Sequence, residues 1–142
     1  MSGMTNYVIA EPTEVPEICD HPWPLEKWPG FEGYKFFASD ELGHLLGILN
    51  DGKGSYRDFP ILKSGERGWV YSIPSDLVTR LLEQKPSELP KLAEAWTDRI
   101  NTQMRSRWEP AALQELLEKL RELALTGRRA SRAMFLWHSL AV

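Results

Sequence analysis

The sequence predicts an α+β fold, in which three to four helices pack on a small mixed or antiparallel sheet that includes a buried C-terminal strand. The first observation is an apolar stripe with a period of 3.6 residues in the segment 110–126, typical of an amphipathic helix. The stripe consists of Leu113, Leu116, Leu117, Leu120, Leu123 and Ala124. The second observation is the uninterrupted apolar run 133–137, which suits a short strand covered on both faces. The third is a pair of short segments, 59–62 and 68–73, which predict a hairpin with a turn at 63–66.

Residues 1–33 form a Pro/Trp-rich acidic arm, which we expect to wrap around a single α+β domain of residues 34–142. Prolines exclude a long helix from the arm, and its first residues should be loose because nothing apolar ties them down. The side chains of Trp23, Trp28 and Phe31 are costly to leave in water, which favours their burial against the edge of the domain. The alternative is that these three aromatic residues form an exposed patch that binds a partner.

After the arm, the aromatic segment 34–38 predicts a strand, and apolar residues at helical spacing predict a helix over 39–49. Within that helix, Gly43 and Gly47 indicate close packing against a neighbouring element. Residues 50–55 have the composition of a loop.

Two more helices are expected at 75–85 and 87–104, because each opens at a serine and repeats apolar residues at helical spacing. Pro110 suits the first turn of the long helix that follows. That helix should end at Gly127, since glycine adopts the left-handed conformation without a steric clash.

Length and composition limit the class of protein. The chain has 142 residues, which suits one domain with an attached arm, and no apolar stretch reaches the roughly 18 residues that a membrane-spanning helix needs. Residues 1–10 lack the basic and apolar regions of a secretory signal. Cys19 is the single cysteine, so an internal disulfide is excluded and a reducing cytoplasm is expected. The net charge of −3 argues against a nucleic-acid-binding protein, which needs a dominant basic surface.

The sequence contains no pattern that predicts a catalytic, cofactor-binding or metal site. Residues 47–54 nearly match a phosphate-binding loop, but Gly54 replaces the final hydroxyl residue, and a helix precedes the loop instead of following it. Asp40 and His44 are four residues apart and can share a helical face, yet two ligands do not close a metal site. We therefore expect no cofactor and no metal.

Arg128, Arg129 and Arg132 form a short basic cluster after the long helix. The simpler interpretation is that they complement the dipole at the helix C-terminus. The alternative is that they hold an anionic group or an acidic partner.

Residues 69–140 resemble a set of short, uncharacterised bacterial proteins. The shared features are Trp69–Pro74, Asp76–Val78, Leu92–Trp96, Leu116–Ala124 and Leu136–Leu140. The helix–helix–strand ending is also similar to the YfbM-like family of unknown function. These resemblances imply a bacterial, cytoplasmic, stand-alone small domain and transfer no catalytic residue.

The leading hypothesis is a small non-enzymatic protein, either a protein-binding or an accessory factor of the immunity type. Its partner would be another protein, with no nucleic acid and no membrane, and a homodimer is compatible with the sequence. The candidate partner-binding residues are Trp23, Trp28, Phe31, Arg128, Arg129 and Arg132. The alternative is a small hydrolase or transferase whose site is assembled from scattered carboxylates and His44. A pocket with His44 and two carboxylates would favour the enzyme, and a flat aromatic patch would favour binding.

Overall fold

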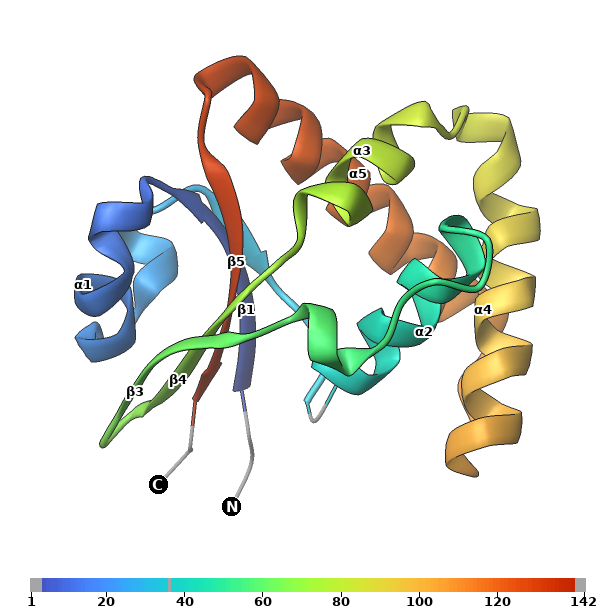
Figure 1. Cartoon of the computed structure of the whole chain (residues 1–142), viewed down its shortest axis with the longest axis horizontal. Coiled ribbons are helices and arrows are strands. Elements are labelled where there is room, and N and C mark those ends of the chain that lie inside the picture. Colours follow the sequence, from blue (N-terminus) through green and yellow to red (C-terminus); the bar gives the residue numbers. More distant parts are fainter. Residues whose placement is uncertain (1–3, 36, 140–142) are drawn as a thin grey trace.

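The computed structural model describes residues 4–35 and 37–139, which contain a five-stranded sheet with the strand order β2-β1-β5-β4-β3. All neighbouring strands are antiparallel, which is one of the two arrangements that the sequence predicted (Figure 1). The strands are β1 (Met4–Ala10), β2 (Gly30–Glu32), β3 (Ile61–Gly65), β4 (Gly68–Ser72) and β5 (Ala133–Ser139). The predicted C-terminal strand, β5, is the central strand of the sheet and is largely buried.

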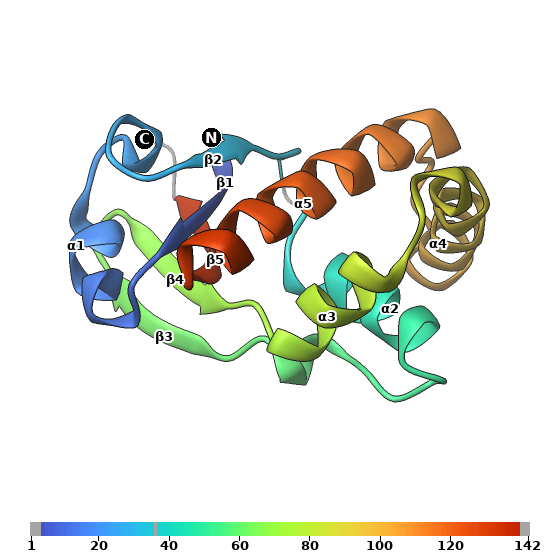
Figure 2. The same ribbon diagram turned by 90° about the horizontal axis from the view of Figure 1, so that it is seen from above.

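Five α-helices accompany the sheet in the described part of the chain. They are α1 (Val15–Asp20), α2 (Ser39–Leu49), α3 (Ser75–Glu83), α4 (Leu89–Met104) and α5 (Pro110–Ala130). Helices α2 to α5 gather on one side of the sheet, and α1 lies on the other side (Figures 1 and 2). The predicted α+β class is therefore confirmed, with five helices in place of three to four.

Successive residues of β1 face two different hydrophobic cores, because side chains alternate across a strand. Tyr7 and Ile9 belong to the larger core, which also contains the leucine stripe of α5. Val8 and Ala10 belong to a smaller core on the opposite face of the sheet. The smaller core is completed by Val15, Ile18, Cys19, Trp28, Val70, Phe135 and Trp137. The segment 11–29 thus forms a third layer over the face of the sheet that the four larger helices leave free.

The expectation that the first residues of the chain are loose is wrong for Met4 and Thr5, which belong to β1, while residues 1–3 lie outside the described residues. Strand β1 pairs with β5 along its whole length, beginning with Met4 opposite Ser139, and it pairs with β2 on its other side. The second half of β1 is a short apolar run, the same signal that predicted β5. Thr5 and Asn6 concealed this signal because they are polar, although both side chains are buried.

The predicted strand at 34–38 is also wrong, because the residues described there form a turn that leads into α2. Residue 36 lies outside the described residues. Phe37 packs instead against Trp96 and Trp108, with ring centroids 5.3 and 5.1 Å apart. The aromatic residues in this segment raise its strand propensity, but their packing between helices decides the local structure.

The predicted hairpin is confirmed, but β3 extends from Ile61 to Gly65, so its turn follows Gly65 instead of occupying 63–66. Helix α5 does not end at Gly127 but continues to Ala130, and Ser131 adopts the left-handed conformation with φ 55°. Gly127 has a different role. A Cβ atom at this position would lie 3.1 Å from Cγ2 of Ile9, so the glycine allows α5 to approach β1 closely.

Candidate functional site

Trp23 and the two arginines Arg128 and Arg132 lie near opposite ends of β1. Trp23 borders a shallow hollow that includes Met4, at the start of the strand. Arg128 and Arg132 border a groove that includes Ile9, near its end. Trp23 therefore lies on a different surface from Arg128 and Arg132.

The three predicted aromatic residues of the arm have different environments. Trp28 is 3% exposed, belongs to the smaller core and donates its indole N–H to Oε2 of Glu14 at 3.1 Å. Phe31 is half-buried and stacks on Tyr7 with ring centroids 4.9 Å apart. Trp23, in contrast, is 55% exposed. Burial against the domain is thus confirmed for Trp28, partial for Phe31 and wrong for Trp23.

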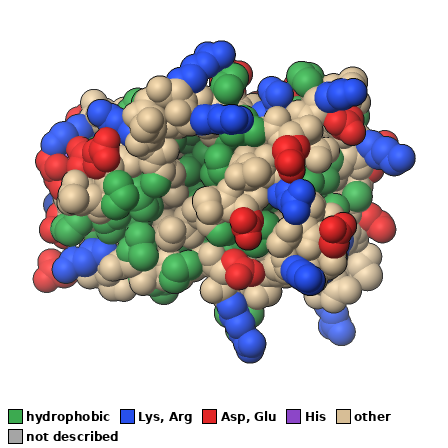
Figure 3. All heavy atoms as spheres, turned by 45° about the horizontal axis from the view of Figure 1, so that its top comes forward, with side chains coloured by type: hydrophobic (Ala, Val, Ile, Leu, Met, Phe, Trp, Pro, Cys, Tyr) green, Lys and Arg blue, Asp and Glu red, His purple; other side chains and the backbone are tan. Residues whose placement is uncertain are grey.

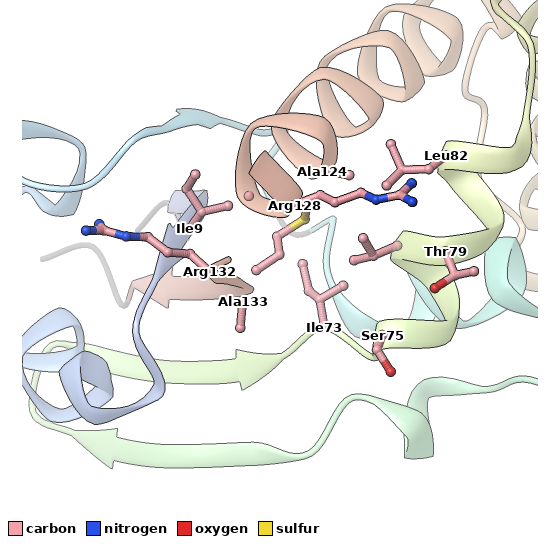
Figure 4. Close-up of a pocket in the computed structure, with 12 residues that line it drawn as sticks. Ile9, Ile73, Ser75, Thr79, Leu82, Ala124, Arg128, Arg132 and Ala133 are labelled. Carbon is pink, nitrogen blue, oxygen red and sulfur yellow. The ribbon is translucent and has the colours of Figure 1, made fainter. Parts of the chain in front are cut away.

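A groove of about 380 Å³ lies between α3, the last turns of α5 and the adjoining ends of β1 and β5, and we call it the α3–α5 groove (Figure 4). Its lining is mostly apolar, with two hydroxyl side chains and two guanidinium groups. The lining residues are Ile9, Ile73, Ser75, Val78, Thr79, Leu82, Ala124, Gly127, Arg128, Arg132, Ala133 and Met134.

The groove follows from a change of side-chain size along α5. The leucine stripe fills the space under the helix as far as Leu123, and the next inward positions are Ala124 and Gly127. On α3, Leu77 and Leu81 enter the core, whereas their neighbours Val78 and Leu82 remain half-buried. Small residues on one wall and partly exposed apolar residues on the other therefore leave an open apolar surface.

The guanidinium groups of Arg128 and Arg132 point in opposite directions (Figure 4). Arg128 extends across the groove toward Leu82, and Arg132 points away toward the α1 side, where its Nε atom lies 3.9 Å from Oε1 of Glu11. Among the described residues, no carboxylate belongs to the groove lining. Figure 3, with the upper side of Figure 1 turned forward, shows hydrophobic side chains among both basic and acidic side chains on this face. Arg128 thus gives an otherwise apolar groove a positive charge.

Arg129, the third predicted arginine, is exposed and does not line the groove. It lies with Arg128 in the last turn of α5, where cations complement the helix dipole. This residue therefore offers a matched control for Arg128.

His44 lines a second cavity of about 400 Å³, and Asp40 is the single carboxylate that the described residues contribute to its lining. Arg99, on α4, donates its Nε–H to Nδ1 of His44 at 3.2 Å. Burial lowers the pKa of His44, and the charge of Arg99 lowers this pKa further, while Asp40 acts in the opposite direction. The cavity therefore combines His44 with one carboxylate and one cation, in place of the two carboxylates that the enzyme hypothesis requires.

Sequence reasoning missed several residues of these sites. Thr79 was not singled out, Leu82 was counted only among the apolar residues of the helix at 75–85, and Arg99 is 55 positions from His44 in the sequence. For the groove, the available signal was the second apolar pair on α3, Val78 and Leu82, beside the pair that faces the core. No local pattern links Arg99 to His44.

Among the described residues, no group of three His, Cys, Asp or Glu side chains is placed to hold a metal ion. Within the same ranges, every helix is too short or too polar to cross a membrane.

Comparison of the chain with protein-family models, with curated proteins and with solved structures finds no match. The resemblance of residues 69–140 to short bacterial proteins therefore stays a prediction.

Proposed function

We propose that this chain is a non-enzymatic protein-binding domain, an accessory or immunity-type factor, whose α3–α5 groove holds a short segment of a partner protein. The observation that carries the proposal is an apolar groove crossed by the guanidinium of Arg128, with no carboxylate in its lining. Ser75 and Thr79 supply hydroxyl groups, but no His, Asp or Glu lines the groove to activate them. The lining therefore suits binding better than catalysis.

The chemistry of the groove defines the segment that it would bind. Its apolar walls suit aliphatic or aromatic anchor side chains, which supply most of the binding energy in protein interfaces. The guanidinium of Arg128 suits a carboxylate, with which arginine forms paired hydrogen bonds. The volume of about 380 Å³ is enough for a few side chains. We therefore expect a short apolar segment that carries an Asp, a Glu or a terminal carboxylate.

The enzyme hypothesis has less support, because the cavity that contains His44 is lined by one carboxylate, Asp40, and not by two. We also propose a cytoplasmic location, in which the single, buried Cys19 would stay reduced.

Binding of anilinonaphthalene sulfonate, which joins apolar rings to an anionic group, tests the groove directly. We expect Arg128→Gln to weaken binding of this dye by about tenfold, because a charge-assisted hydrogen bond is lost. Leu82→Glu should also weaken binding, because it places a negative charge in the apolar wall. Arg129→Gln is the matched control and should bind the dye like the unmodified chain.

Selection from a random peptide library then tests the class of occupant. Peptides that combine apolar residues with a carboxylate, and that compete with the dye, would support the proposal. Equal dye affinity of the Arg128→Gln and Arg129→Gln variants, or enrichment of basic peptides, would contradict it.

Sedimentation of the chain alone shows whether it forms a dimer. A dimer that Arg128→Gln dissociates would identify a second copy of the chain as the occupant and would overturn the proposal of a different partner.

A further inference from the structure

The cavity beside His44 shares no lining residue with the α3–α5 groove and has a different chemical character. It lies between α2, the end of α4 and the loop that follows α2. Its lining consists of Asp40, Gly43, His44, Gly54, Ser55, Tyr56, Arg99 and Met104.

Two glycines on α2 bring the walls of this cavity together. A Cβ atom on Gly43 would overlap the backbone of Ser55 and Tyr56, so this glycine allows the loop to lie directly on the helix. A Cβ atom on Gly47 would lie 3.3 Å from Nη2 of Arg99, so the guanidinium rests on the surface that this glycine leaves open. The close packing expected of both glycines is thus confirmed, and its result is that Arg99 is held next to the cavity.

Arg99 is half-buried, and no ion pair between described residues involves it. Its hydrogen bond to His44 uses one of the five N–H donors of a guanidinium. A partly buried charge without a counter-ion is unfavourable, and a bound anion would relieve this cost.

The neighbouring side chains can also donate hydrogen bonds. Because Nδ1 of His44 accepts a hydrogen bond from Arg99, the ring proton of the neutral imidazole is on Nε2. The hydroxyl oxygen of Ser55 accepts from the backbone N–H of Arg57 at 3.2 Å, and that of Tyr56 accepts from Nε of Arg57 at 3.4 Å. The protons of both hydroxyls are therefore left to donate.

We infer that this cavity binds a tetrahedral oxyanion of the phosphate type, either free phosphate or the phosphate group of a small monoester. Donors come from three parts of the fold, namely α2, the loop after it and α4, and all of them line this one cavity. A carboxylate presents two oxygens in one plane and would use fewer of these donors. Asp40 is the one opposing charge in the lining, and it favours the protonated form of His44. Burial and the charge of Arg99 lower the pKa of His44 more than Asp40 raises it, and a bound anion would act with Asp40 to raise this pKa.

Titration of the full-length chain with sodium phosphate, followed by calorimetry and by NMR of the histidine ring nitrogens, tests this inference. We expect saturable binding at millimolar phosphate and a rise in the pKa of His44. Arg99→Gln should reduce the affinity for phosphate at least tenfold, and His44→Gln should reduce it less. Gly47→Ala keeps every donor and shifts the guanidinium by a few tenths of an ångström, so it should weaken binding by less than Arg99→Gln and provides a readout even if Arg99→Gln prevents folding.

The groove variants provide cross-controls. Arg128→Gln should leave phosphate binding unchanged, because Arg128 does not line this cavity, so the phosphate site and the groove can fail independently. Phenyl phosphate that binds more tightly than phosphate would identify a monoester as the ligand, and equal affinities would identify free phosphate. The inference would be overturned if neither compound gives a saturable response or if chloride gives an equal one. It would also be overturned if phosphate binds both Arg99→Gln and Gly47→Ala as it binds the unmodified chain.

Discussion

Replacing Trp28 by alanine tests whether the segment 11–29 is a structural layer of the domain. The Trp28 side chain is 3% exposed, contacts the smaller core and satisfies its indole N–H on Glu14. Removal of a buried tryptophan leaves a cavity and typically costs about 3–5 kcal/mol of unfolding free energy. We expect a loss in this range for Trp28→Ala. Trp28→Phe should lose less unfolding free energy than Trp28→Ala, because a large ring still fills the core. It still loses the hydrogen bond to Glu14.

Trp23 is the matched control, since it lies five positions earlier in the same segment and is 55% exposed. Trp23→Ala should change the unfolding free energy by no more than about 0.5 kcal/mol, the usual range for surface substitutions. Urea denaturation followed by circular dichroism measures both variants, and equal slopes would show that the difference lies in stability. A loss below about 0.5 kcal/mol for Trp28→Ala, or equal losses for both variants, would refute the packing of this segment on the sheet.

Two further predictions concern stability. Leu120→Ala should lower the unfolding free energy by about 2–5 kcal/mol in the same urea assay, because Leu120 is buried in the larger core, whereas Glu118→Ala on the exposed face should have little effect. Burial lowers the pKa of His138 from its usual value of 6.5, so the unfolded chain binds more protons than the folded chain just below that pH. The stabilisation that depends on the neutral form of His138 is therefore complete above about pH 6.5 and is lost as the pH falls. Between about pH 7.5 and 5.5, the melting temperature of His138→Gln should therefore decline less than that of the unmodified chain. An unchanged decline would contradict this role of His138.

The sequence determined the elements whose signal is local. The leucine stripe of α5 and the stripes of α2, α3 and α4 identify helices because a helix presents every third or fourth residue to the same neighbour. The hairpin of β3 and β4 and the apolar run of β5 are equally local. The sequence also identified Arg128 and Arg132 as a basic cluster, because they are close together in the chain.

The geometry of the candidate sites depends on tertiary packing between helices, which no local sequence pattern indicates. Arg128 crosses an apolar groove because α5 ends in small residues at Ala124 and Gly127, opposite the half-buried side of α3. Arg99 meets His44 because α4 packs on α2, and Gly47 gives its guanidinium room. Neither contact can be read from spacing in the sequence.

The tertiary structure alone decided the place of the first strand. Thr5 and Asn6 are polar and resemble a loose terminus, yet they lie in a strand whose central partner is β5, at the other end of the chain. A strand obtains its hydrogen-bond partners from other segments, so its pairing and register depend on residues far away in the sequence. Helices obtain these partners within their own segment, and for this physical reason α2 to α5 could be predicted from local spacing, whereas the pairing of β1 could not.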